Sequence, residues 1–372
     1  MDVCGFSNEG YGTLHHNLPS IITSYLKYMG YTHVLLLNLN TSASDNSLGN
    51  LATAFIDTFH SNGIKVILHI TPRDVTDKKL YVYTLVDKIE RLEADGVFID
   101  VPYIEYCDKP LIREISDAIH NISNNTAVIV DKRIAAEYNG SRFDYTIDSA
   151  PFIGAVDFVS LDPYFRRHTQ DLFEKCLSNE KNTRVIPLSC FDSRAEFKSI
   201  FESAYGSYED KLNQKRAIDL LIMSLHGKKL TLMGNEFSGC IRENNKPMVN
   251  WNLLDVESHN DMRSFVRSLN HFYLATPVMH SDDTELSLIP LSENEKGKNI
   301  ILLKRKSQCN EILTVVNLSG IEQSIDIISK VAVDCIFATQ YHVNSASIHH
   351  HDQGDTYTIT LPAFCGAVYR LK

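Results

Sequence analysis

The stretch Gly227-Lys228-Lys229-Leu230-Thr231-Leu232-Met233-Gly234-Asn235-Glu236-Phe237 contains a short apolar run that ends at a glycine and is followed by an acidic residue. Fourteen residues later comes Trp251-Asn252-Leu253-Leu254-Asp255, and then Arg263–Tyr273, whose apolar residues have the 3.6-residue spacing of a helix. A strand followed by an amphipathic helix is the repeating unit of parallel α/β folds. The stretch therefore predicts the last unit of such a fold.

The chain before this stretch has the same alternation. Short apolar runs alternate with segments of helical spacing, although the link between the fifth and sixth runs contains no clear helix. Eight such units favour a compact (β/α)₈ TIM barrel. The eight predicted strands are Asp2–Phe6, His33–Leu39, Lys65–Ile70, Gly96–Val101, Ala127–Asp131, Asp157–Leu161, Arg184–Leu188 and Leu230–Gly234.

The pattern changes after Thr276-Pro277, where helical spacing gives way to strand-like runs separated by turns. These runs predict a C-terminal antiparallel all-β domain. We therefore expect a barrel domain over residues 1–275 and an all-β domain over residues 276–372. The predicted strands of the second domain are Ile300–Lys304, Glu311–Leu318, Ile321–Ile327, Ala332–Ala338 and Thr356–Leu361.

The composition is that of a globular protein, with 44% hydrophobic and 22% charged residues. The net charge of −10 argues against a nucleic-acid partner and against an anionic membrane surface. The first residues lack the basic and apolar regions of a signal peptide, and the eight cysteines form no CxxC pair, so we expect a cytoplasmic protein with reduced thiols. Without a glycine-rich phosphate loop, we expect no cofactor.

The motifs quoted above resemble the last strand and last helix of the barrel in glucan branching enzymes of the α-amylase clan, which read close to GKKLLFMGQEF, DWHLL and LVRDLNRLY at the same offsets. Ser61–Pro72 is similar to the family segment AGIGVILDWVP, and Asp95–Val101 to DGLRVDAV. The resemblance implies a barrel with a C-terminal β domain. It also implies retaining chemistry on α-glucans, in which one carboxylate attacks the anomeric carbon and a second donates a proton.

The resemblance also assigns site residues. The nucleophile position falls on Asp100 and the acid/base position on Asp131, and Asp192 lies one residue from the position of the third carboxylate. The implied substrate-binding positions are His69, Asp74 and Glu236.

Most of the family's catalytic positions carry other chemistry in this chain. The arginine that orients the nucleophile falls on Phe98, and the His-Asp pair after the seventh strand falls on Cys190 and Phe191. The segment between the second and third strands is reduced to Asn40–Gly49. The one tryptophan, Trp251, occupies a position that is structural in the family, and we expect it and Phe265 to be buried.

Loss of several cooperating groups removes nearly all of an enzyme's chemistry. We therefore expect a branching-enzyme-like pseudoenzyme with a degenerate site, whose partner is an α-glucan of the glycogen or starch type or another protein. The alternative is an active 1,4-α-glucan branching enzyme that uses Asp100 as nucleophile. A metal-dependent hydrolase at the same strand ends is a third class, but the spacing of its acids and His69 forms no metal motif.

His349-His350-His351 is a histidine run within the predicted β domain. The expected structure is a solvated loop between strands, and adventitious metal binding is the alternative. No metal is expected at the strand ends that carry Asp100 and Asp131.

Overall fold

The computed structural model describes residues 1–2, 6–7, 17–37, 46–72, 75–101, 108–138, 143–177, 183–189, 199–243, 246–281, 283–292, 295, 297–308, 310–339, 347–351 and 355–371. Contacts group the chain into two compact units. The first comprises Met1–Asp148, Leu232–Gly234 and Gly239–Trp251. The second comprises Ser149–Thr231, Asn235–Ser238 and Asn252–Lys372.

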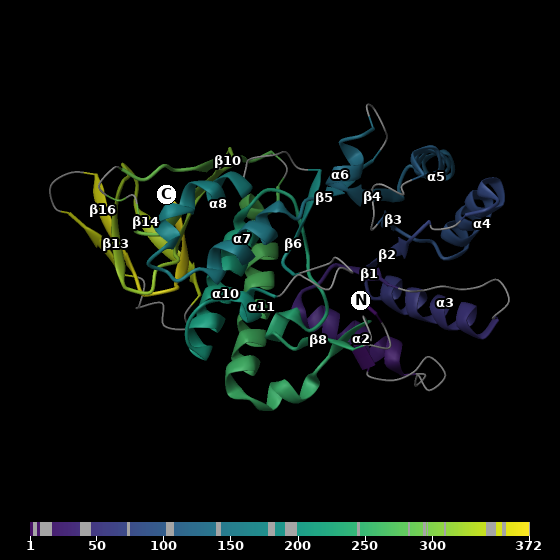
Figure 1. Ribbon diagram of the computed structural model, residues 1–372, viewed down its shortest axis with the longest axis horizontal. Helices are drawn as coiled ribbons and strands as arrows, with labels where there is room; N and C mark the ends of the chain where they lie inside the picture. The colour runs from purple at the N-terminus through teal and green to yellow at the C-terminus, as the bar shows by residue number, and fades with distance from the viewer. Residues whose placement is uncertain are drawn as a thin grey trace. The chain divides into compact units, whose positions relative to one another are not determined.

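The first unit is built on parallel strands that are hydrogen-bonded in chain order, with helices between them (Figure 1). The strands are β1 (His33–Leu36), β2 (Lys65–Ile70), β3 (Gly96–Ile99), β4 (Ala127–Asp131) and β5 (Tyr145–Ile147). The helices are α2 (Leu18–Met29), α3 (Asn46–Ser61), α4 (Lys78–Arg91), α5 (Lys109–Ile122) and α6 (Lys132–Ala135). An antiparallel pair, β8 (Cys240–Glu243) and β9 (Lys246–Val249), also belongs to this unit.

The helix boundaries follow from local chemistry. Pro19 occupies the first turn of α2, and Gly30 ends that helix with a left-handed φ of 79°, which glycine adopts without a Cβ clash. The carboxylates of Asp77 and Asp108 accept hydrogen bonds from the backbone N–H groups of Leu80 and Leu111, and so cap α4 and α5. The segments of helical spacing that precede these strands are thus helices.

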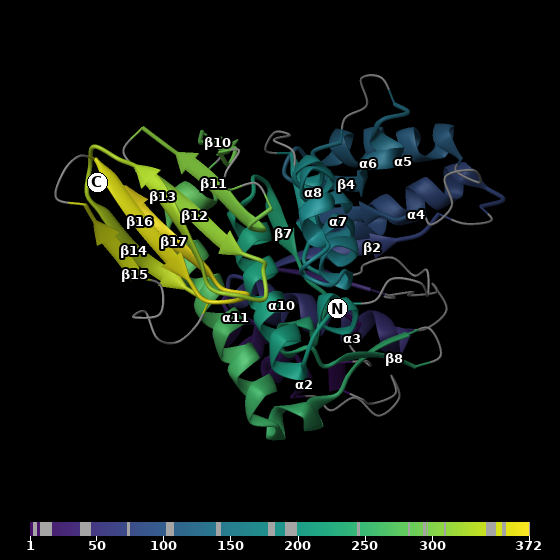
Figure 2. The same ribbon diagram turned by 60° about the vertical axis from the view of Figure 1, so that its left-hand side comes forward.

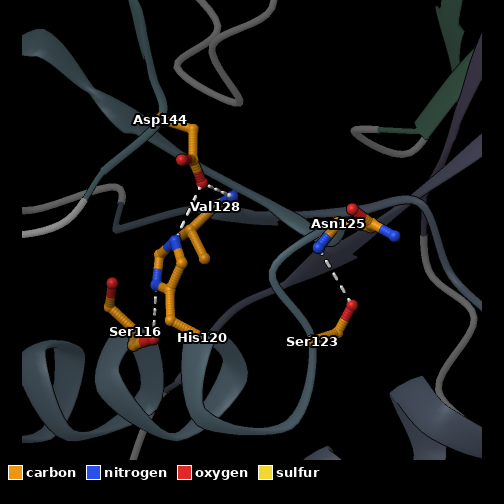
Figure 3. A network of polar contacts seen from close by, with 6 residues as sticks. All are labelled: Ser116, His120, Ser123, Asn125, Val128 and Asp144. Carbon is orange, nitrogen blue, oxygen red and sulfur yellow. Dashed lines mark hydrogen bonds and ion pairs between the residues drawn. The ribbon is translucent and has the colours of Figure 1, made fainter.

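Two similar sets of hydrogen bonds, each centred on an aspartate and called a polar clamp here, join a helix to a strand at the amino ends of the parallel strands. His120, in the last turn of α5, lies 3.0 Å from Asp144, which precedes β5 and accepts a 2.7 Å hydrogen bond from the backbone N–H of Val128 in β4 (Figure 3). The same arrangement joins α3 and β2: His60 lies 2.9 Å from Asp95, whose carboxylate accepts from the backbone N–H of Val66 at 2.8 Å. Each aspartate thus satisfies a strand N–H and a helix histidine together.

We expect Asp144→Ala to lower the free energy of unfolding by about 1–3 kcal/mol, because the Val128 N–H and the His120 ring lose their acceptor. Urea denaturation at constant m-value measures the change. Ser123→Ala is the control: its hydroxyl accepts only from the exposed Asn125 N–H in the adjacent turn (Figure 3), and we expect a change within about 0.5 kcal/mol. Equal losses in both variants would show that the clamp adds nothing.

The second unit begins with helical elements and a parallel strand pair, β6 (Arg184–Pro187) and β7 (Lys228–Leu230). Its helices and short 3₁₀ turns are α7 (Ala150–Ser160), η2 (Arg166–His168), α8 (Gln170–Cys176), α9 (Ile200–Ser203), α10 (Tyr208–Ser224), η3 (Asn235–Phe237), α11 (Glu257–Ala275) and η5 (Pro277–Met279), and η4 (Trp251–Asp255) spans the change of unit. Helix α11 confirms the helix predicted over Arg263–Tyr273.

The predicted strand Asp157–Leu161 is wrong, since these residues belong to the end of α7 and its C-cap. Pro151 occupies the first turn of that helix, and apolar residues also stand outside its buried face, at Ile153 and Val156, so the sequence lacks the polar stripe that marks a helix. The true strand is β5, only three residues long. The described residues hold seven parallel strands. Of the first predicted strand, residues 3–5 lie outside the description, and its predicted end at Phe6 is wrong, because Phe6 is helical and its backbone N–H donates to the carbonyl of Asp2 at 3.0 Å.

The C-terminal part of the second unit consists of two antiparallel sheets (Figure 2). The five-stranded sheet has the order β10-β11-β12-β17-β14, and the three-stranded sheet the order β13-β16-β15. The strands are β10 (Glu285–Leu288), β11 (Ile300–Lys306), β12 (Glu311–Asn317), β13 (Gln323–Ile328), β14 (Val333–Ala338), β15 (Ser347–His350), β16 (Thr356–Leu361) and β17 (Gly366–Leu371). All five predicted strands correspond to observed ones, whereas β10, β15 and β17 were not predicted.

The boundary predicted between residues 1–275 and 276–372 stays a prediction. Helix α11 ends at Ala275 and the antiparallel strands begin at Glu285, which agrees with the change in sequence pattern. Contacts nevertheless group these strands with α10 and α11, because α10 packs on β12 and β17.

Trp251 lies in an aromatic cluster of the first unit. Its indole N–H donates a 2.7 Å hydrogen bond to the carbonyl of Phe6, and its ring meets the rings of Phe6 and Tyr25 edge-on at 4.9 and 5.4 Å. The Trp251 side chain is partly exposed but mostly buried, and Phe265 is only 3% exposed, so the predicted burial is confirmed for both.

We expect Trp251→Ala to lower the free energy of unfolding by about 2–3 kcal/mol, below the usual value for a fully buried tryptophan. Trp251→Phe keeps an aromatic ring and loses only the hydrogen bond, so about 1 kcal/mol is expected. Thermal melts measure both. An unchanged melting temperature in Trp251→Ala would indicate an exposed ligand platform instead.

Candidate functional site

The first unit brings His69 and Asp100 into contact at the carboxyl ends of β2 and β3. The Nε2 atom of His69 lies 3.1 Å from Oδ2 of Asp100, and the two side chains are 14% and 31% exposed. The backbone N–H of Asp100 donates to the carbonyl of Ile70 at 2.8 Å, which fixes the carboxylate just beyond the strand end. Strand ends of this kind are where parallel α/β folds carry their chemistry.

An apolar side chain lies beside this pair. Phe98 is two residues before Asp100 and therefore on the same face of the sheet. It is 3% exposed, and its ring centroid lies 5.6 Å from that of His69, its register partner on β2. The position that the resemblance assigns to the orienting arginine is thus a buried hydrocarbon ring in this chain.

Asp131 ends β4, next to β3, and also caps the short helix α6. Its carboxylate accepts a hydrogen bond from the backbone N–H of Arg133 at 2.7 Å. Both carboxylate oxygens also accept from the Arg133 guanidinium, each at 2.9 Å. This two-pronged pair holds the carboxylate by both oxygens. A general acid has to present a proton to the leaving oxygen, so the Arg133 pair would have to open first.

Sequence reasoning missed Arg133 and Asp148. Asp148 follows β5, is 4% exposed on its side chain and lies 3.4 Å from the ammonium of Lys132. An aspartate directly after an apolar run is the signal that could have found it. The signal was hidden because Tyr145–Ile147 is too short to stand out as a strand, and the strand was sought at Asp157–Leu161.

The other predicted site residues are not brought into this group. Asp74 and Asp192 lie outside the described residues, as do Cys190 and Phe191. Glu236 belongs to the second unit, in η3, where its side chain is 2% exposed and so is enclosed by protein. The catalytic role of Asp192 and the substrate-binding roles of Asp74 and Glu236 stay predictions.

A shallow surface groove of about 670 Å³ lies elsewhere in the first unit, over α4 and α5. Its lining is strongly charged and includes Lys109, Arg113, Glu114 and Asp117, but neither His69 nor Asp100. Within the described part of the chain, no set of three or more His, Cys, Asp or Glu side chains is arranged to hold a metal ion. No helix among the described residues is both long and apolar enough to cross a membrane.

Solved structures of the α-amylase clan share this fold. The catalytic module of SpuA, a glycogen-degrading pneumococcal virulence factor, matches with a TM-score of 0.72 at 10% identity, covering 100% of this chain and 77% of that one. The α-amylase from H. orenii matches with a TM-score of 0.68 at 12% identity, covering 95% of each chain. The α-amylase from Geobacillus thermoleovorans, complexed with acarbose, has a TM-score of 0.68 at 13% identity, covering 100% and 95%.

Comparison of the sequence with curated proteins finds similarity to glucan branching enzymes. A 1,4-alpha-glucan branching enzyme, GlgB 1 of Clostridium perfringens strain SM101, is 22% identical over 382 aligned positions, covering 79% of this chain and 57% of the enzyme. The GlgB branching enzyme of Halothermothrix orenii is 24% identical over 280 positions, covering 71% and 42%. The chain thus spans about half the length of these relatives. No family model matches it.

These similarities confirm the resemblance drawn from the motifs: the chain is similar to glucan branching enzymes at low identity, and its fold is that of α-amylases. Parallel strands with connecting helices, followed by antiparallel sheets, are the architecture that this resemblance implies.

Proposed function

We propose that this protein is a branching-enzyme-like scaffold whose catalytic site is degenerate and which binds an α-glucan, or a protein partner, without transferring sugar. The observation that carries the proposal is the pair formed by His69 and Asp100 beside the buried ring of Phe98. A nucleophilic carboxylate needs fixed polar groups around the developing charge of the sugar. Here its neighbour on the same strand is apolar.

The engagement of Asp131 supports the same proposal. A retaining mechanism needs a second carboxyl group that stays protonated until it donates to the leaving oxygen. Asp131 instead accepts three hydrogen bonds from Arg133. Its stem is also one methylene shorter than that of glutamate, and a shift of about 1 Å in a catalytic group costs on the order of 100-fold in rate.

Native gel electrophoresis in the presence of dissolved glycogen or amylose tests the binding part of this proposal. We expect the protein to be retarded by the polysaccharide, and free maltoheptaose to restore its mobility by competition. Bovine serum albumin in the same gel controls for viscosity. Equal mobility with and without glucan would remove the glucan from the proposal and leave the protein partner.

The second candidate is an active branching enzyme with Asp100 as nucleophile, and the strand register favours it. Ile99 and Val130 are register partners on β3 and β4, so Asp100 and Asp131 follow them at the same level on neighbouring strands. Neighbouring strands lie about 4.8 Å apart, and retaining enzymes hold their two carboxyl groups about 5–5.5 Å apart. Release of Asp131 from Arg133 is the step that this candidate requires.

We also infer that the parallel strands close into an eight-stranded barrel, with Met1 beside β1. The backbone N–H of Leu37, directly after β1, donates to the carbonyl of Met1 at 2.8 Å. Such a bond is what a strand paired with β1 on its outer edge would make, and it supports the inference.

A further inference from the structure

The three-stranded sheet β13-β16-β15 has two faces of opposite character. Ile325 and Ile359 are fully buried in the core between the two sheets, and Ile348 packs against that core. The alternate residues must then point outward, because side chains alternate along a strand. The register places Asp326, Thr358 and His349 in one row across this outer face.

The histidine run is part of this sheet and is not the loop that its composition predicts. His349 and His350 lie on the edge strand β15, and the backbone N–H of His351 continues the pairing by donating to the carbonyl of Thr356 at 3.1 Å. His349 and His351 are two residues apart and share the outer face. His350 points the other way, with its ring 4.5 Å from that of Tyr357.

The two outer imidazoles have the separation of a pair of metal ligands. Their ring centroids are 5.2 Å apart, with 83° between the ring planes. In a tetrahedral site with Zn–N bonds of about 2.0–2.1 Å, two imidazole ligands have their centroids roughly 5 Å apart. Both side chains are exposed, so water can occupy the remaining coordination positions.

A hydrogen-bonded chain fixes which nitrogen of His351 carries the proton. The hydroxyl of Thr358 donates to the carboxylate of Asp326 at 2.5 Å. A carboxylate only accepts hydrogen bonds, so the one proton of the Thr358 hydroxyl is used in the bond to Asp326. The Thr358 oxygen must therefore accept the 2.8 Å hydrogen bond from Nε2 of His351. Nε2 is then the N–H, and the lone pair lies on Nδ1. A hydrogen-bond acceptor behind a ligating histidine fixes its tautomer and the orientation of its ring.

We propose that His349 and His351 form a surface site for a divalent transition-metal ion of the kind that imidazole prefers, such as Zn²⁺ or Co²⁺. His351 binds through Nδ1, Asp326 and Thr358 orient it, and water completes the coordination. Two protein ligands are fewer than the three or four of catalytic and structural zinc sites, so the ion is exchangeable. This metal site is independent of the glucan-binding proposal, because it involves none of the residues on which that proposal rests.

Titration of the full chain, without an affinity tag, with Zn²⁺ in a calorimeter tests the proposal. We expect one site in the wild type, and binding at least about 10-fold weaker in His349→Ala and in His351→Ala. His350→Ala is the matched control from the same run and should bind as the wild type does. The visible spectrum of the Co²⁺ complex should shift on binding to the wild type and not to His349→Ala.

The Asp326→Asn variant distinguishes a preorganised metal site from two histidines that lie close together by chance. Loss of a carboxylate behind a ligating histidine typically weakens metal binding by about 10-fold or more, and we expect that effect here. Circular dichroism of each variant verifies that the β-sheets are retained. Wild-type binding that is absent, or that is lost equally in His350→Ala, would overturn the proposal, as would an unchanged affinity in His349→Ala.

Discussion

Replacing Lys215 by Met is expected to lower the free energy of unfolding by about 3–5 kcal/mol at neutral pH. Lys215 and Asp219 are one turn apart in α10 and form a 2.6 Å ion pair, with side chains only 1% and 5% exposed. The second carboxylate oxygen of Asp219 has no hydrogen-bond partner among the described residues. Removing the ammonium would therefore leave a buried carboxylate with almost nothing to balance its charge.

The position of the pair explains why water cannot replace the lost partner. Helix α10 packs on β12 and β17, and the hydroxyl of Thr314 in β12 donates to that of Ser224 near the helix end at 3.0 Å. Nearly every residue of α10 from Leu212 onward is buried. A helix enclosed to this degree gives a charged side chain no route to solvent.

The loss should shrink in acid. Burial raises the pKa of Asp219 above its ordinary value, and Lys215 opposes this rise through its charge and its hydrogen bond. In Lys215→Met that opposition is gone, so the pKa rises further. Between the unfolded value, about 3.9, and the raised folded value, the folded state holds a proton that the unfolded state has released. Stability is therefore lost as pH rises through this window and regained as pH falls.

Urea denaturation of wild type and Lys215→Met at pH 7 and pH 5 measures this difference. The double variant Lys215→Met/Asp219→Leu is the control, because replacing both members of a buried pair by apolar residues is often neutral or stabilising. We expect it to recover most of the lost stability. An equal deficit in the single variant at both pH values, or no recovery in the double variant, would show that packing and not charge is responsible.

The sequence predicts those elements whose local signals agree with their tertiary environment. Lys65–Ile70 and Ala127–Asp131 are observed with the predicted ends, because β-branched runs bounded by polar residues leave little choice of strand. Helix α7 shows the opposite case. The apolar residues Ile153 and Val156, outside its buried face, remove the polar stripe by which helical periodicity is recognised. The strand β5 was missed for a different reason: its three residues are too few to show an alternating pattern.

The sequence predicts which residues belong to the candidate site, but it does not predict the contacts that these residues make. The resemblance assigned Asp100, Asp131 and His69, and the structure brings Asp100 and His69 together. The Arg133 guanidinium on Asp131 depends on a turn of α6, and no sequence pattern indicates that a side chain two residues on will fold back onto the strand end. The histidine run was misread because composition alone does not distinguish an edge strand from a loop.

A comparison of wild type with Asp100→Asn decides between the two candidate functions. We expect neither protein to form α-1,6 branches on amylose in an iodine-stain or chain-length assay, with a known branching enzyme as positive control. The charge that develops on the sugar in the transition state is normally stabilised by fixed polar groups, and this electrostatic stabilisation is usually the largest catalytic contribution. Phe98, 3% exposed, cannot supply it.

The survival of one carboxylate does not offset that loss. Groups that act together in catalysis are not additive, so a single retained member contributes little without its partners. Arg133 holds Asp131 through both carboxylate oxygens. His69 contacts Oδ2 of Asp100, and a sugar would have to displace this contact to reach that oxygen. If wild type branches amylose and Asp100→Asn abolishes the activity, the degenerate-site proposal is wrong and Asp100 is the nucleophile. If both are silent while glycogen retards both in a native gel, the protein binds glucan without acting on it.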